Sequence, residues 1–152
     1  MITRERLKEA LWYSPVTGNF YWNSNMKRAG SHHKDYIRIA IDCHDYYAHQ
    51  LAWLYMTGEW RQVDHKNRHG KENWFSNLRP ANFRQNKANS RVSRNSLTGL
   101  KGVTYFQGRY QARIVYNYKK YHLGVYDTAE EAHAVYLRRA EELFGEFAHD
   151  GS

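Results

Sequence analysis

The amino-acid sequence predicts an α+β fold made of two small domains. Short stretches in which apolar and polar residues alternate occur in both halves of the 152-residue chain, as is typical of strands with one buried face. Apolar residues at helical spacing recur near the start, the middle and the end of the chain. Residues 91–99 are mostly basic or small and polar, so they cannot form a core of their own. We therefore expect domains at residues 1–90 and 100–152, joined by a basic linker.

The first domain is expected to combine β-hairpins with helices. Residues 3–12 predict a short helix, and the turn residues of SPVTGN lead into an aromatic strand at residues 19–22. The isoleucines of residues 36–42 alternate with other residues, which predicts a strand with one apolar face. Residues 48–56 have helical spacing, and Gly58 is well placed to end that helix.

The second domain is expected to be a three-stranded antiparallel sheet packed on one helix. The strands are predicted at residues 101–106, 109–116 and 119–126. A helix follows, because Thr128 and Glu131 form the pattern of a capping box. The residues expected to face this helix alternate along the strands: Val103, Tyr105, Tyr110, Ala112, Ile114, Tyr121, Leu123 and Val125.

Composition limits the classes of partner. The chain has 23 basic and 15 acidic residues, a formal net charge of +8, which favours a polyanion such as nucleic acid. A single cysteine, Cys43, excludes a disulfide within the chain and a cysteine-rich zinc knuckle, so we expect no structural zinc. The N-terminal stretch has no apolar core of a signal peptide, and no apolar run approaches the ~20 residues that span a bilayer. We expect a soluble, cytoplasmic protein with no membrane partner.

One polar stretch, VDHKNRHGKENWFSNLRPANFRQN at residues 63–86, carries the candidate chemistry. Asp64 and His65 are adjacent, and Asn77 and Asn86 follow thirteen and twenty-two positions after Asp64. If a helix begins at Arg79 or Pro80, Asn86 lies about two turns into it and points back toward the strand. A carboxylate and an amide oxygen would suit a hard divalent ion, and a neutral histidine can deprotonate water. An isolated Asp-His pair is more often a solvated turn, so the prediction depends on the whole set.

The residues Asp64-His65, Asn77-Leu78-Arg79 and Asn86 resemble the HNH nuclease motif, a ββα-metal fold, in its phage and intron-associated homing-endonuclease branch. The resemblance covers most of residues 11–90. It implies that Asp64 and Asn86 bind a divalent metal ion, Mg²⁺ first and Mn²⁺ as the alternative. It also implies that His65 is the general base and Asn77 the structural middle asparagine. The implied substrate is double-stranded DNA in the cytoplasm of a bacterial host, and the implied source is a phage.

The loop between these residues departs from the family pattern. The family often has Ile-Asn-Gly-Asp after the Asp-His pair and Asp-Asn-Arg before the second asparagine. Here the corresponding residues are Lys66-Asn67-Arg68-His69 and Glu72-Asn73-Trp74, which shape the hairpin loop rather than the metal site. We interpret Asn67, Asn73 and Asn82 as loop or surface residues. The roles of His44, His49 and His69 stay open. Of these three, His49 is the best candidate for a catalytic role.

The second domain resembles the ethylene-response-factor (APETALA-type) DNA-binding domain over residues 100–148. The matching stretches are Lys101-Gly-Val, Arg109-Tyr-Gln-Ala-Arg-Ile, YHLGVYDTAEEA from Tyr121, and Phe144-Gly-Glu-Phe-Ala148. A sheet of this width can enter the major groove, where Arg and Gln read purine edges and Lys holds phosphates. The candidate DNA contacts on the sheet are Lys101, Thr104, Arg109, Gln111, Arg113, Lys120 and His122. Those expected to follow the phosphate backbone from the linker region are Lys87, Arg91 and Arg94.

The sequence therefore predicts a metal-dependent DNA endonuclease, of the free-standing homing or mobile kind, targeted by its second domain. It would make a nick or a double-strand break and act as a monomer, with a dimer as the alternative. A second hypothesis is a non-catalytic, sequence-specific DNA-binding regulator with a degenerate HNH unit. A third is an RNA-binding or structural protein.

Overall fold

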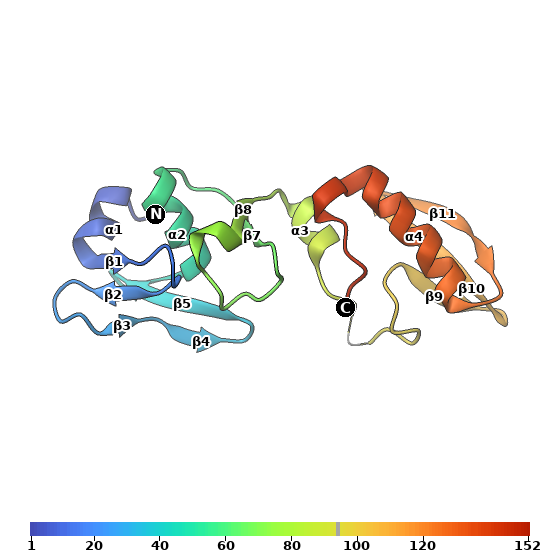
Figure 1. Ribbon diagram of the computed structural model, residues 1–152, viewed down its shortest axis with the longest axis horizontal. Helices are drawn as coiled ribbons and strands as arrows, with labels where there is room; N and C mark the ends of the chain where they lie inside the picture. The colour runs from blue at the N-terminus through green and yellow to red at the C-terminus, as the bar shows by residue number, and fades with distance from the viewer. Residues whose placement is uncertain (94) are drawn as a thin grey trace. The chain divides into compact units, whose positions relative to one another are not determined.

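The computed structural model describes residues 1–93 and 95–152 and confirms the α+β class, with four α-helices and several antiparallel sheets in this part of the chain. The chain divides into two compact units, Met1–Asn82 and Phe83–Ser152 (Figure 1). Each unit has its own buried apolar residues. Among the described residues, no helix has both the length and the apolar character needed to cross a membrane.

The first unit begins with helix α1 (Arg4–Ala10), which the Thr3 hydroxyl caps by accepting a 3.2 Å hydrogen bond from the Arg6 N–H. Strands β1 (Leu11–Tyr13), β2 (Phe20–Trp22) and β3 (Arg28–Ala29) follow and form a sheet in that order. The expected helix over residues 3–12 is too long, because Leu11–Tyr13 pairs with Phe20–Trp22 instead. The aromatic strand expected at residues 19–22 is confirmed.

A second sheet has the order β4 (Ser31–His33), β5 (Tyr36–Ile41), β6 (His44–Tyr47). The alternation in β5 is confirmed, since its three isoleucines are buried. Helix α2 (Ala48–Thr57) ends at Gly58, whose φ of 81° is the left-handed conformation expected of a C-cap. The largest fully buried side chains of the unit are Leu7, Leu11, Tyr13, Phe20, Ile39, Leu51 and Leu54.

Two short strands position the candidate nuclease residues. Strand β7 (Val63–His65) pairs with β8 (Leu78–Pro80), and the 3₁₀ turn η1 (Phe75–Asn77) leads into β8. The expectation that a helix begins at Arg79 or Pro80 is wrong, because these residues pair with Asp64 and Val63. Helix α3 (Phe83–Asn89) begins later, so Asn86 lies in its first turn rather than two turns in.

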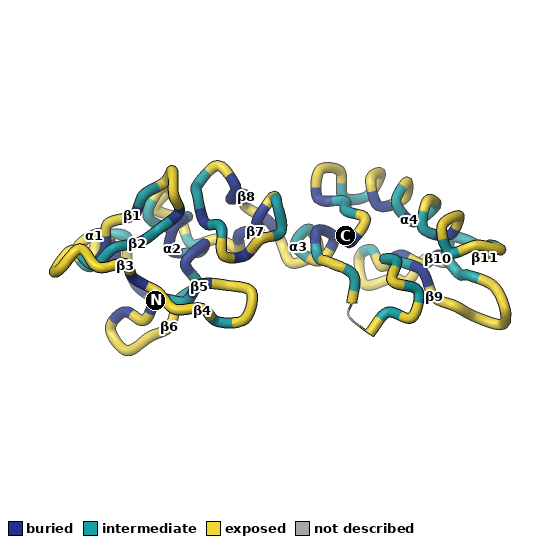
Figure 2. The backbone as a smooth tube through the Cα atoms, turned by 60° about the horizontal axis from the view of Figure 1, so that its bottom comes forward, coloured by how far each residue is buried: buried dark blue, intermediate teal, exposed yellow. Residues whose placement is uncertain are grey.

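The second unit contains α3 and a sheet packed against helix α4 (Ala129–Phe144), with the turn η2 (Gly145–Phe147) after it. The sheet order is β11 (Lys119–Tyr126), β10 (Arg109–Tyr116), β9 (Val103–Phe106), close to the three predicted strands. Exposed and buried segments alternate along α4, as an amphipathic helix requires (Figure 2). The capping box is confirmed in both directions, with hydrogen bonds of 3.2 and 3.3 Å between Thr128 and Glu131.

A β-bulge changes which side chains of β11 face outward. The register of β10 and β11 shifts between Ala112 and Arg113: Ala112 pairs with Gly124, but Arg113 pairs with His122. The extra residue reverses the alternation beyond it, so Val125 pairs with Gln111. The prediction that Val125 faces the helix is therefore wrong, and its side chain is 38% exposed.

The segment around the predicted linker is held to the second unit. Helix α3 packs against α4 and η2, and the Val92 N–H donates to the Gly151 carbonyl at 3.0 Å. The Lys101 ammonium donates to the carbonyls of Ala88 and Ser90. The division of the chain therefore falls after Asn82, earlier than the limit expected from composition. The expected domain limits themselves stay a prediction.

Candidate nuclease site and nucleic-acid interface

His65 is a buried imidazole whose orientation is fixed by one amide. Its side chain is 4% exposed, and its Nε2 lies 2.9 Å from the Asn73 Oδ1. Because an amide oxygen can only accept, Nε2 carries the proton and Nδ1 carries the lone pair. Burial lowers the pKa of His65, and this outweighs the opposing effects of Asn73 and Asp64. The ring is therefore neutral at neutral pH, with Nδ1 as its basic nitrogen.

Asn73, interpreted from sequence as a loop or surface residue, lies in the loop between β7 and β8 but is 2% exposed, so it is not a surface residue. Its carbonyl accepts a 2.6 Å hydrogen bond from the Tyr13 hydroxyl. Its backbone also lies directly against Gly18, where an added Cβ would come within 2.3 Å of the Asn73 carbonyl carbon. Next to it, the Phe75 N–H donates to the Pro15 carbonyl at 2.8 Å. The turn of the first hairpin thus supports the residue that orients His65, a contact that no local sequence pattern reveals.

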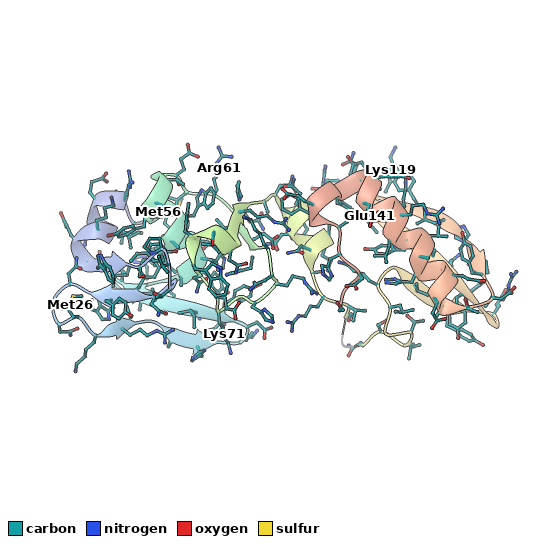
Figure 3. All side chains as sticks on the ribbon, in the orientation of Figure 1. Met26, Met56, Arg61, Lys71, Lys119 and Glu141 are labelled. Carbon is teal, nitrogen blue, oxygen red and sulfur yellow. The ribbon has the colours of Figure 1, made fainter. Side chains whose placement is uncertain are left out.

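Asn77 organises the loop between β7 and β8. It is 4% exposed, and its Nδ2 donates to the Asn67 Oδ1 at 2.9 Å and to the Glu72 carbonyl at 2.7 Å. Its Oδ1 accepts from the Asn67 N–H at 3.1 Å. Lys71, labelled in Figure 3, lies in the same loop, and its carbonyl accepts a 3.3 Å hydrogen bond from the Asn73 Nδ2. The amide that contacts the His65 ring is therefore Asn73, while Asn77 bonds to Asn67 and Glu72, which precede Asn73 in the same loop.

Asp64 lies opposite Arg79 in the β7–β8 pair. The Arg79 Nε and Nη2 donate to the Asp64 Oδ2 at 3.1 and 3.0 Å, and both side chains are buried. A buried carboxylate requires such compensation, because desolvation would otherwise disfavour its charge. The motif includes Arg79 but does not identify its pairing with Asp64, because that pairing depends on the strand register.

Asp64 is the candidate oxygen ligand for a metal ion. The described residues contain no group of three or more His, Cys, Asp or Glu placed to hold a metal. In proteins Mg²⁺ keeps several waters and takes one or two carboxylates together with substrate phosphate. The Asp64 carboxylate is the hard oxygen donor that this chemistry requires. Asn86 lies half-buried on α3 in the second unit, and its role as a ligand stays a prediction from the sequence.

His49 is a neutral packing partner of His65. The two rings lie 4.9 Å apart edge to face, and His49 also stacks on Tyr47 at 5.5 Å. Burial lowers the pKa of His49 to about 3, and its Nδ1 has no hydrogen-bond partner among the described residues. His44 and His69 are exposed. The Nδ1 of His44 lies 2.8 Å from the Asp42 carbonyl, and the Nδ1 of His69 lies 3.9 Å from the Glu72 carboxylate.

Most of the side chains predicted to contact DNA from the second sheet lie on its outer face. Gln111 and Arg113 lie opposite the face that holds the buried Ala112 and Ile114. Across the strands, three rows of neighbours are formed: Thr104–Gln111–Val125, Arg113–His122 and Val115–Lys120.

Other residues predicted to contact DNA bond to neighbours or line a cavity within the second unit. Arg109 pairs with Asp127 at 2.8 Å, and the Lys101 ammonium is bound to two carbonyls next to α3. Lys87 and Arg91 line a cavity of about 540 Å³ within the second unit. Arg94, expected to contact phosphate, lies outside the described residues. The other cations around this cavity are Arg84, Lys101 and Arg113.

The chain is similar to a protein of Acanthamoeba polyphaga mimivirus that is named an uncharacterised HNH endonuclease. The two are 37% identical over 86 residues, which is 57% of this chain and 44% of that relative. The matched segment thus spans less than half the length of the relative. No family model matches the chain. No solved structure matches it.

Proposed function

We propose that this protein is a metal-dependent HNH DNA endonuclease. The observation that carries the proposal is the buried His65, kept neutral and fixed by Asn73, next in the chain to the buried Asp64. The similarity to a viral protein named an HNH endonuclease supports it independently. The arrangement suits phosphodiester hydrolysis, which needs both a base for water and a site for a cation.

In this proposal the Nδ1 of His65 accepts the proton of the attacking water, while its Nε2–H stays bonded to Asn73. Asp64 and, by resemblance, Asn86 hold the metal ion, Mg²⁺ or alternatively Mn²⁺. When bound, such an ion neutralises charge on the phosphate and the leaving oxygen. Asn77 holds the loop that carries Asn73. His65 needs no pH-driven activation, since burial keeps the ring neutral at cellular pH.

The second unit is proposed to target the nuclease to double-stranded DNA through the outer face of its sheet, in the manner of the ethylene-response-factor domain. The exposed cations Arg113 and Lys120 support this role. A free-standing homing or mobile endonuclease of phage type fits the combination of a cutting unit with a reading unit. Holding both on one chain raises the local concentration of the cutter at its site.

A plasmid-cleavage assay tests the nuclease proposal. Supercoiled plasmid is incubated with the full chain and Mg²⁺ or Mn²⁺, beside the variants His65→Ala and His44→Ala. We expect nicked or linear product from the wild type and from His44→Ala, whose imidazole is exposed. We expect a loss of at least about 100-fold for His65→Ala, in line with the usual contribution of a general base. Absence of product with either ion contradicts the nuclease, and equal cutting by His65→Ala contradicts the base.

One observation favours a second candidate, a DNA-binding regulator without catalysis. Arg79 donates two hydrogen bonds to Asp64, which satisfies this carboxylate without a metal ion. In this case the protein would bind a DNA probe in a gel-shift assay but leave plasmid intact with every divalent ion. The same assays thus separate the two candidates.

A further inference from the structure

The outer face of the second sheet places one amide between two side chains that carry methyl groups. Gln111 on the central strand pairs with Thr104 on β9 and with Val125 on β11. Neighbouring strands lie about 4.7–4.9 Å apart, so the three side chains form one row across the face. Val125 takes its place there only because of the bulge at Gly124, whose φ of +133° few other residues adopt. Val125 is 38% exposed and Thr104 is exposed.

This row matches the major-groove edge of an A·T pair. A glutamine side chain can bond adenine N6 and N7 together, and the thymine of the same pair presents its C5-methyl group to apolar side chains. Arg113 and His122 form the next row and Lys120 the one after, so cations adjoin the amide as contact with a DNA duplex requires. Further apolar side chains project on the same face, with Phe106 53% and Val115 57% exposed.

We propose that the sheet selects an A·T pair, with Gln111 bonded to the adenine and Val125 in contact with the thymine methyl. This inference rests on the proposed targeting role of the second unit and adds to it the kind of base pair that is read. It identifies Val125, a residue that strand alternation assigns to the protein interior, as a specificity-determining residue.

The test begins with selection of a binding site by the full-length protein. A random duplex library is used in EDTA, so that binding is measured without cleavage. The enriched site is then synthesised with thymine or with uracil, one position at a time. Uracil keeps every hydrogen bond of thymine and lacks only the C5-methyl. Dissociation constants are measured by fluorescence anisotropy for the wild type, Val125→Ala, Val125→Thr and Leu97→Ala.

We expect at least one enriched A·T pair at which uracil weakens binding by the wild type about fourfold, the effect of one buried methyl group. Val125→Ala should bind the thymine and uracil probes equally at that position. Val125→Thr keeps one methyl and the β-branch, so it should retain part of the discrimination. Leu97→Ala, which changes a side chain 96% exposed in the same unit, should discriminate as the wild type does.

Each contrary result has a distinct meaning. A site that lacks A·T pairs, or equal affinity for thymine and uracil at every position, overturns the inference but leaves DNA targeting standing. Persistent discrimination by Val125→Ala overturns the assignment to Val125. If no sequence is enriched at all, the proposed targeting role fails together with the inference, while the plasmid assay still decides the nuclease.

Discussion

The nitrogen of His65 that can accept a proton is determined by a side chain eight positions further along the chain. The Asn73 Oδ1 takes the Nε2–H, and two more contacts hold Asn73 itself, at Tyr13 and at Gly18. A histidine without this acceptor could rotate or change tautomer, since both ring nitrogens can carry the proton. In the proposed mechanism Asn73 is thus a positioning residue, which acts through His65.

Replacing Asn73 tests this role. Asn73→Ala should fold but cut plasmid about 10–100-fold more slowly, which is the usual cost of losing a residue that orients a functional histidine. The matched control is Asn23→Ala, which also removes an amide bonded to main-chain carbonyls in the same unit, those of Lys8 and Glu9. Cleavage of plasmid by Asn73→Ala at the wild-type rate would show that Asn73 does not position His65.

The buried His49 makes the stability of the first unit depend on pH. Its pKa is about 3 in the folded protein but about 6.5 in an unfolded chain, so between these values only the unfolded state binds the proton. The free energy of unfolding should therefore fall as the pH decreases from 6.5. The contribution of His49 lost by pH 5 is about 2 kcal/mol. Burial lowers the pKa of His65 as well, which adds to the loss in the same direction.

Urea unfolding followed by tryptophan fluorescence at pH 6.5 and pH 5 measures this effect. His49→Gln has no proton to gain, so its unfolding free energy should change about 2 kcal/mol less than that of the wild type over this interval. An equal change in the two proteins would mean that His49 is not buried as a neutral ring.

At the level of elements, periodicity explains what the sequence predicted well. The alternation in β5, the C-cap at Gly58 and the capping box at Thr128 are local patterns, and each appears in the structure. Strand β1 and the bulge beside Gly124 depend on pairing with other strands, so no local pattern identifies them. One inserted residue in β11 was enough to reverse the side on which Val125 lies.

The residues of the candidate site also differ in whether a local sequence pattern reveals them. Asp64, His65 and Asn77 could be found because their spacing matches a known motif. The motif includes Arg79 but does not reveal its pairing with Asp64, which depends on strand register, and it does not include Asn73, whose loop is held by the first hairpin. Lys101 was expected to contact DNA from its charge and its predicted place on the sheet, yet its ammonium is bonded to main-chain carbonyls. Charge predicts an affinity for polyanions but does not show which cations are already occupied.

At the level of the whole molecule, the two units carry separate apolar cores and different chromophores. All five tryptophans of the chain precede residue 83 and belong to the first unit. The second unit contains α4, which with 16 residues is the longest helix among those described. Tryptophan fluorescence therefore reports on the first unit, while far-UV circular dichroism also reports on the second.

This difference gives a test of whether the units unfold independently. Gly102 has a φ of +75°, and an added Cβ would lie 2.0 Å from the Tyr136 ring, so Gly102→Ala must disturb the contact with α4. We expect the dichroism transition to move to lower temperature by several degrees, consistent with a loss of about 1–3 kcal/mol, while the fluorescence transition stays in place. Gly108→Ala is the matched control, because Gly108 also has a positive φ of +81° but an added Cβ there meets nothing within 4 Å, so this variant carries the backbone strain without the clash. A joint shift of both transitions in Gly102→Ala would show a single cooperative unit.

The contacts of Asn73 with the first hairpin bear on how the proposed nuclease unit could be transferred to another protein. A cassette excised at Val63, where the recognisable motif starts, would keep Asp64, His65 and Asn73 but lose the Tyr13 hydroxyl and the turn at Gly18. Fused to a different DNA-binding protein, it would carry every motif residue and still lack the support for its base. The smallest transferable form of the proposed nuclease unit therefore begins no later than β1, about fifty residues before the motif at Val63.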